Sequence, residues 1–317
     1  MSRKQQVAPI ILFVYNRPDH TQRTVESLAK NNLAKESVLY IFSDAAKNDR
    51  EKEKVSKVRK YIASLNELKY FSSISIKEAD KNRGLATSII SGVTKVMQIH
   101  GSAIILEDDL LSAPDFLDFM NKSLDFYEKD SLIGSISGYS PLQFLPTTYK
   151  KSVWAAARTS SHGWATWKDR WMQVDWDVVD FDKFKKNRKS IKHFNECGSD
   201  RYDRLYRQMS KDIDSWSIRF GYWQFKANLY TIFPKNSRIK NIGWDGSGVH
   251  SSRSVTNNNL ILSKASPFNL LPVTPDKEII LLLKKTYAGS LKSSIGRYLR
   301  TNGFEKVDYI IRKFFLK

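Results

Sequence analysis

Apolar and polar positions alternate along the first part of the chain in a pattern typical of repeated strand and helix pairs. Short runs rich in β-branched and aromatic side chains predict buried strands at residues 9–15, 38–42, 73–77 and 103–106. Stretches with apolar residues at helical spacing predict helices that end near Leu28, cover 49–65, follow Asn82 to about Ile99, and begin at Ser112 or Pro114. Repeated units of this length imply an α/β fold with a mainly parallel sheet, flanked by helices and joined by right-handed crossovers.

The second part of the chain is richer in aromatic residues and less periodic. It predicts a strand at 152–158, a short helix at 164–171, a largely charged helix at 183–209, a Trp- and Phe-rich helix within 212–229 and a loop at 241–250. From residue 277 onward, apolar side chains recur every four residues, which predicts amphipathic C-terminal helices with basic polar faces. We therefore divide the chain into residues 1–150, 151–274 and 275–317.

The composition excludes several classes of protein. Of the 317 residues, 41% are hydrophobic and 27% are charged, which argues against collagen-like, low-complexity and disordered chains. The single cysteine, Cys197, allows neither an internal disulfide nor a zinc site of several thiolates. No apolar run approaches the roughly 20 residues that span a bilayer, and the start does not resemble a signal peptide. We expect a cytoplasmic protein.

The net charge calls for an anionic partner. Lys and Arg outnumber Asp and Glu by 52 to 33, a net charge of +19. Most of the excess lies in residues 151–317, where 31 basic residues face 15 acidic ones. Such a field attracts nucleic acid, an anionic membrane surface or phosphorylated substrates, and the charge alone does not choose among them.

Candidate chemistry follows the predicted strands, because ligands of parallel sheets bind beyond the carboxyl ends of the strands. Arg17 and Asp44 each follow one such strand, and Glu107, Asp108 and Asp109 directly follow another. Three adjacent carboxylates repel one another unless water or a cation neutralises them, and hard oxygen ligands suit Mg²⁺ or Mn²⁺. The alternative is a solvated acidic turn that caps the next helix. The buried strand before the acids and the helix after them favour the metal.

These motifs resemble those of glycosyltransferases of the GT-A fold. The acidic segment Leu106-Glu-Asp-Asp-Leu110, followed by Ala113-Pro-Asp-Phe116, is similar to the metal-binding motif of the family of the Golgi β-1,2-N-acetylglucosaminyltransferase. Further similar segments, some closer to bacterial surface-polysaccharide transferases, are Tyr15-Asn-Arg-Pro18, Ser43-Asp44, Asn82-Arg-Gly-Leu85, the segment 129–137, His162-Gly-Trp164, Asp214-Ser-Trp216 and Gly248-Val-His250. The resemblance is strongest over residues 8–140.

The resemblance implies a role for each matched residue. Asp109 would hold Mn²⁺ or Mg²⁺, Asp214 would be the catalytic base, and the donor would contact Arg17, Asp44, Arg83, Glu107, Asp108, Trp164 and His250. Alternatives remain open for several of them. Asp214 is also suited to cap a helix, with Asp212 as the rival base. Trp164 also fits a hydrophobic core, and His250 also fits an ordinary loop.

The expectation is an inverting, metal-dependent glycosyltransferase that uses a nucleotide sugar, with UDP as the expected nucleotide. Residues 1–150 would bind the donor and metal, and 151–274 the acceptor and the base. The basic second half suits a glycan or polyprenyl-diphosphate-linked acceptor at the inner face of a bacterial membrane, as in surface-polysaccharide or lipopolysaccharide assembly, with residues 275–317 lying on the anionic surface. Nucleic acid is not expected as a partner. The competing classes are a nucleic-acid-binding, metal-dependent enzyme and a non-catalytic sugar-binding relative.

Overall fold

The computed structural model describes residues 7–245, 262, 267–304 and 307–308. Its main feature is an eight-stranded mixed sheet. Its strands lie in the order β3-β2-β1-β4-β8-β6-β9-β7. Their bounds are β1 Ile10–Val14, β2 Val38–Ser43, β3 Ser73–Glu78, β4 Ser102–Glu107, β6 Ile133–Ser137, β7 Val153–Ala156, β8 Trp164–Trp167 and β9 Tyr230–Pro234. A two-stranded sheet of β5 (Leu110–Ser112) and β10 (Ile239–Asn241) lies beside it.

The first four strands, β3-β2-β1-β4, are all parallel, which confirms the expected α/β core. Beyond them the sheet is mixed, because β8 runs antiparallel to both β4 and β6. Strands from both halves of the chain therefore belong to one sheet.

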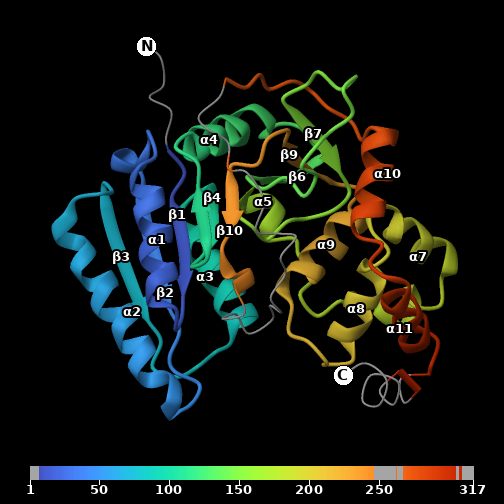
Figure 1. The fold of residues 1–317 in the computed structure, drawn as a ribbon, viewed down its shortest axis with the longest axis horizontal. Coiled ribbons are helices and arrows are strands. Elements are labelled where there is room, and N and C mark those ends of the chain that lie inside the picture. Colours follow the sequence, from blue (N-terminus) through green and yellow to red (C-terminus); the bar gives the residue numbers. More distant parts are fainter. Residues whose placement is uncertain (1–6, 246–261, 263–266, 305–306, 309–317) are drawn as a thin grey trace.

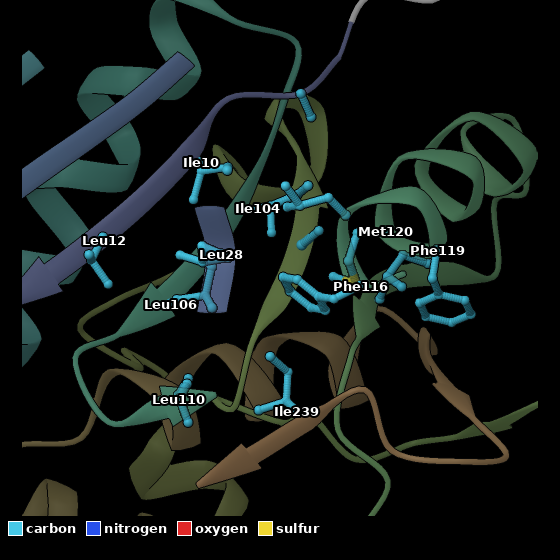
Figure 2. Close-up of a cluster of buried hydrophobic side chains, with 14 of the residues drawn as sticks. Ile10, Leu12, Leu28, Ile104, Leu106, Leu110, Phe116, Phe119, Met120 and Ile239 are labelled. Carbon is cyan, nitrogen blue, oxygen red and sulfur yellow. The ribbon is translucent and has the colours of Figure 1, made fainter. Parts of the chain in front are cut away.

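Helices cover both faces of the sheet (Figure 1). Their bounds are α1 Pro18–Ala29, α2 Asp49–Leu68, α3 Leu85–Ile99, α4 Phe116–Tyr127, α5 Lys168–Trp171, α6 Phe181–Phe184, α7 Arg188–Phe194, α8 Arg201–Met209, α9 Trp216–Lys226, α10 Lys277–Thr286 and α11 Leu291–Thr301. Side chains alternate along β1, so Ile10 and Leu12 pack with α1, α2 and α4, while Ile11 and Phe13 pack with α3 and α9. Figure 2 shows part of the first cluster, in which Leu28 and Leu106 meet.

Two predicted helices of the second half were wrong in part. Residues 164–167 form strand β8, and only the four residues of α5 are helical in the predicted 164–171 segment. Pairing of β8 between β4 and β6 overrides the local helical spacing of the tryptophans. The charged segment 183–209 is divided into α7 and α8, and Gly198 lies between them with φ +137°, a value that interrupts a helix.

The C-terminal helices are present as expected, and α10 belongs to the core. Ile279 and Leu283 of α10 are fully buried in a cluster with Trp154 and Phe233. Figure 1 shows α10 and α11 beside the α7 and α8 region. Within the described residues, no helix has the length and apolar character needed to cross a bilayer.

An ion-pair cluster attaches α11 to α8. Arg300 donates to Asp203 at 2.7 and 3.1 Å and to Asp308 at 2.6 Å. The opposite stripe of α11 faces solvent, with Leu291 78%, Ile295 49% and Tyr298 63% exposed. The tail therefore combines a packed face with an exposed apolar stripe.

Candidate active site

A cavity of about 830 Å³ opens at the carboxyl ends of β1, β2 and β4. Among the predicted site residues, Arg17, Asp44, Arg83, Glu107, Asp108, Asp109 and Asp214 line it. Segments far apart in sequence thus converge on one hollow. Parallel strand pairing explains much of this, because Val14 lies beside Ser43 and Phe13 lies beside Glu107 in register.

Helix α1 holds the acidic turn in place. The Thr24 hydroxyl donates to the carbonyl of Asp108 at 2.9 Å and accepts from the N–H of Leu110 at 3.2 Å. Thr24 is fully buried, so both bonds are shielded from water. The carboxylates are therefore presented by a turn that is fixed at its backbone.

Arg17 forms ion pairs with two of the three acids. Its guanidinium contacts Asp108 and donates to Oδ2 of Asp109 at 3.0 Å. The N–H of Tyr15 also donates to Asp108, at 3.3 Å. Burial raises the pKa of Asp108, and the charge of Arg17 opposes that shift. Two carboxylates are thus balanced by one cation from the neighbouring strand end.

Glu107 has a higher pKa than an ordinary glutamate. Burial, and then the negative charges of Asp109 and Asp108, raise the pKa of Glu107 to about 8. Its carboxyl group therefore holds a proton to a higher pH than an ordinary glutamate does. A protonated carboxyl can donate one hydrogen bond and accept others, which suits a sugar hydroxyl.

Asp44 shapes the turn that opens α3. Its carboxylate accepts from the N–H of Arg83 at 2.9 Å and from the N–H of Gly84 at 3.0 Å. Gly84 has φ +77°, a backbone conformation that glycine adopts readily. The Arg83 side chain is exposed at the cavity. Asp44 thus has a structural role in addition to the donor contact expected for it.

Asp214 approaches the cavity from the second half of the chain. A Cβ built on Gly84 would lie 4.0 Å from Oδ2 of Asp214, so the aspartate lies beside the start of α3. It is a close neighbour of Gly84, and its side chain is 61% exposed and pairs with Arg219 at 3.2 Å. The N-cap of α9 is Ser215, so Asp214 is not the capping residue. Asp212, the rival base, does not line the cavity.

The prediction that Trp164 lies against the donor does not fit its position, and a neighbour lines the cavity instead. Trp164 is 1% exposed and packs on Trp171 and Trp216 with ring centroids 5.6 and 4.8 Å apart. Because β8 is an interior strand, its side chains enter the core. His162, two residues earlier, lines the cavity. Burial lowers its pKa, so its imidazole is neutral near pH 7.

Sequence reasoning also missed the segment that covers the acidic turn. Ile242 donates its N–H to the carbonyl of Asp109 at 2.8 Å, and Gly243 and Trp244 line the cavity. A Cβ on Gly243 would lie only 2.1 Å from Oδ2 of Asp109, so any side chain at position 243 would force the Asp109 carboxylate to move. The sequence feature that could have indicated this contact is the Gly243-Trp244 pair, which lies in a segment predicted as a loop. His250 lies outside the described residues.

The carboxylates fit a divalent cation that brings other ligands with its substrate. Within the described part of the chain, no group of three or more His, Cys, Asp or Glu side chains could hold a metal by itself. Mg²⁺ and Mn²⁺ are commonly bound by one or two carboxylates together with substrate phosphates and water. Asp109 lines the cavity and uses Oδ2 for Arg17, which is compatible with that arrangement.

Two solved structures of other proteins are similar to parts of this structure. The structure is similar to a crystal structure of S. aureus TarS residues 1–349, with 12% identity, a TM-score of 0.31, and coverage of 55% of this chain and 49% of that one. It is also similar to a UDP-glucose pyrophosphorylase complexed with UDP-glucose, with 10% identity, a TM-score of 0.36, and coverage of 72% and 90%. The chain thus spans about half of the TarS structure. No curated protein matches the sequence.

A family model gives the decisive match. The model described as the GNT-I family matches residues 1–192, which include β1 to β4, the acidic turn and His162. This is more than half of the chain, and it agrees with the GT-A type of α/β fold expected from the motifs. The chain therefore belongs to the GNT-I family, a family of glycosyltransferases.

Proposed function

We propose that this protein is an inverting, metal-dependent glycosyltransferase that takes its sugar from a UDP-sugar. The observation that carries the proposal is the convergence of Asp44, the acidic turn and Asp214 on one cavity. The first two would bind the nucleotide sugar, and Asp214, which lines the same cavity near Gly84, would take the proton of the acceptor hydroxyl. Membership in a glycosyltransferase family supports this assignment.

The proposed reaction is a single displacement. The oxygen of the acceptor hydroxyl attacks the anomeric carbon and forms a new C–O bond, while the bond from that carbon to the β-phosphate oxygen breaks. The bonding electron pair leaves with UDP, and Asp214 takes the proton of the hydroxyl. Because attack and departure occur on opposite faces, the anomeric configuration inverts. A positioned general base contributes roughly 10²–10⁴ in rate.

The other cavity residues bind and orient the donor. We propose that Asp44 contacts the uracil, Asp108 the ribose and protonated Glu107 the sugar. Arg17 and Arg83 would lie near the diphosphate, and the contact of His250 with the donor stays a prediction from the sequence. When bound at Asp109, Mn²⁺ or Mg²⁺ would supply positive charge to the leaving β-phosphate oxygen.

Donor use is tested with the full chain and a panel of UDP-, GDP-, CMP- and dTDP-sugars. We expect only the UDP-sugars to raise the melting temperature in the presence of Mn²⁺, because a ligand that binds the native state stabilises it. Release of UDP in the presence of Mn²⁺ then separates an enzyme from a non-catalytic sugar-binding relative. If a sugar linked to another nucleotide stabilised the protein instead, the donor would be assigned to that nucleotide. Binding of a UDP-sugar without any release of UDP would contradict the assignment as an enzyme.

We further propose that the acceptor is a glycan or polyprenyl-diphosphate-linked sugar of bacterial surface-polysaccharide or lipopolysaccharide assembly, reached at an anionic membrane surface. The support is the exposed stripe of α11, formed by Leu291, Ile295 and Tyr298, within a tail where ten Lys and Arg face four Asp and Glu. Basic residues near an anionic surface contribute about 1 kcal/mol each. Insertion of the stripe into the interface adds apolar burial.

Co-sedimentation with liposomes tests the surface. We expect the chain to sediment with vesicles of phosphatidylglycerol and phosphatidylcholine at low salt, and the triple variant Leu291→Ser, Ile295→Ser, Tyr298→Ser to remain in solution. The matched control carries Phe144→Ser and Val179→Ser, two side chains that are 78% and 81% exposed outside the tail. Equal sedimentation of both variants would show that the stripe does not bind the vesicle.

A further inference from the structure

The acidic turn already has a cation of its own. Arg17 contacts Asp108 and donates to Asp109 at 3.0 Å, and its side chain is 17% exposed, against 4% and 13% for the two acids. The pair is therefore partly shielded from water, where ionic hydrogen bonds are stronger than at an open surface.

Surrounding backbone leaves this pair little freedom. The carbonyl of Arg17 accepts from both the N–H and the hydroxyl of Thr21, each at 2.9 Å. On the other side, a Cβ on Gly243 would lie 2.9 Å from Nη1 of Arg17, so the 241–244 segment covers the pair closely. Arg17 is thus anchored at its backbone, and its guanidinium lies in a narrow space beside the cavity.

This arrangement sets a requirement for metal binding. A divalent cation that reaches Asp109 alone must compete with the guanidinium for that carboxylate and would bring further positive charge close to Arg17 in a partly buried place. A nucleotide diphosphate would remove this competition for Asp109, because its oxygens can accept hydrogen bonds from Arg17. A planar guanidinium forms bidentate hydrogen bonds with phosphate as well as with carboxylate.

We propose that Arg17 exchanges partners. In the nucleotide-free protein it holds Asp108 and Asp109, and when the donor binds it turns to the diphosphate and frees Asp109 for the metal. Arg17 therefore makes metal binding depend on the nucleotide and protects the empty site from a bare cation. This inference rests on the proposed use of a nucleotide-sugar donor with a metal at Asp109.

Mn²⁺ binding to the full chain, measured by electron paramagnetic resonance of free Mn²⁺ with and without UDP, tests the exchange. We expect the wild-type chain to bind Mn²⁺ weakly alone and more tightly with UDP. In Arg17→Gln the nucleotide-free affinity should rise about tenfold, because the competing ionic bonds are absent, and the benefit of UDP should shrink. Arg23→Gln is the matched control, since it removes an exposed arginine of the same helix.

A second variant keeps the test valid if Arg17→Gln fails to fold. Arg17→Lys retains the charge but lacks the bidentate fork, so its nucleotide-free Mn²⁺ affinity should lie between those of the wild type and the glutamine variant. If the Arg17 variants fold and bind Mn²⁺ with the wild-type affinity, the exchange is overturned. In that case, UDP binding by the wild-type chain would still support the proposed function. A wild-type chain that binds no nucleotide, with or without Mn²⁺, would overturn the proposed function and the exchange together.

Discussion

At the scale of single residues, neighbouring carboxylates have different tasks because their surroundings differ. Burial and neighbouring charges raise the pKa of Glu107, Asp108 is buried and paired with Arg17, and Asp109 faces both Arg17 and the cavity. Three identical charges side by side would repel one another. The raised pKa of Glu107 and the ion pairing of the other two acids with Arg17 reduce that repulsion.

Replacement of Asp109 by asparagine should abolish the effect of metal on donor binding. The amide cannot supply the negative oxygen that a divalent cation requires, so UDP should bind equally with and without Mn²⁺. Isothermal titration calorimetry measures both affinities. Asp49→Asn on α2 is the control, because that side chain is 90% exposed and far less constrained. If Mn²⁺ still strengthened UDP binding in Asp109→Asn, the metal would be held elsewhere.

Asp214→Asn should separate chemistry from binding. We expect turnover to fall by roughly 10²–10⁴ while UDP affinity stays within about twofold, since the proposed role of Asp214 is to take a proton from the acceptor and not to bind the donor. Asp212→Asn removes the same charge two residues away, at a position that does not line the cavity, and should keep near-normal turnover. The reverse pattern would make Asp212 the base.

At the scale of elements, connections between distant helices and strands hold the site and the tail. Thr24 of α1 fixes the acidic turn between β4 and β5, and Ile242 after β10 bonds to the same turn. In the tail, Arg300 performs the equivalent task, because it joins α11 to Asp203 of α8. Each connection joins elements that are far apart in the chain.

Arg300→Met should therefore weaken the whole fold. Its partners Asp203 and Asp308 have side chains only 8% exposed, so loss of the guanidinium leaves negative charge in a poorly hydrated place. Removal of one partner of a buried ion pair costs about 3–5 kcal/mol. Urea denaturation measures the free energy of unfolding, with Lys292→Met on the exposed side of α11 as the control. An equal, small change in both variants would show that α11 contributes little to stability.

At the scale of the whole molecule, one sheet includes strands from the half of the chain proposed to bind the donor and from the half proposed to bind the acceptor. Strand β8 lies between β4 and β6, so residues expected to bind acceptor are built onto the strands that bear the acidic turn. The tail, residues 275–317, packs onto the domain through α10, whose Ile279 and Leu283 are buried in a cluster with Trp154. The tail therefore contributes to the folded core, whether or not it also binds a membrane as proposed.

Truncation after Pro272 should reveal this. Burial of an aliphatic side chain contributes about 1.5–3 kcal/mol, and the deletion removes Val273, Ile279 and Leu283 and uncovers Trp154 and Phe233. We expect the melting temperature to fall by about 10 °C or more. Differential scanning fluorimetry compares it with Leu291→Ser, which changes an exposed position and should leave the melting temperature unaltered. A truncated chain with the wild-type melting temperature would show that α10 does not stabilise the domain.

The sequence by itself determined the features that depend on neighbouring residues. Alternating apolar runs and helical spacing predicted β1 to β4 and the helices between them, because strand and helix periodicity is set within a few residues. The acidic turn after β4 was equally local, since the buried strand and the three carboxylates that follow it are contiguous in the chain. Because parallel strand ends share one edge, Arg17 and Asp44 could also be expected near it.

Only the tertiary structure decided which side chains face the cavity. Trp164 and His162 are two residues apart, yet the position of β8 inside the sheet sends the tryptophan into the core and leaves the histidine at the cavity. Gly243 became important because a segment more than 130 residues away covers Asp109. Such contacts arise from the packing of distant elements, and no pattern within a short stretch of sequence encodes the distance between two elements that meet only when the chain has folded.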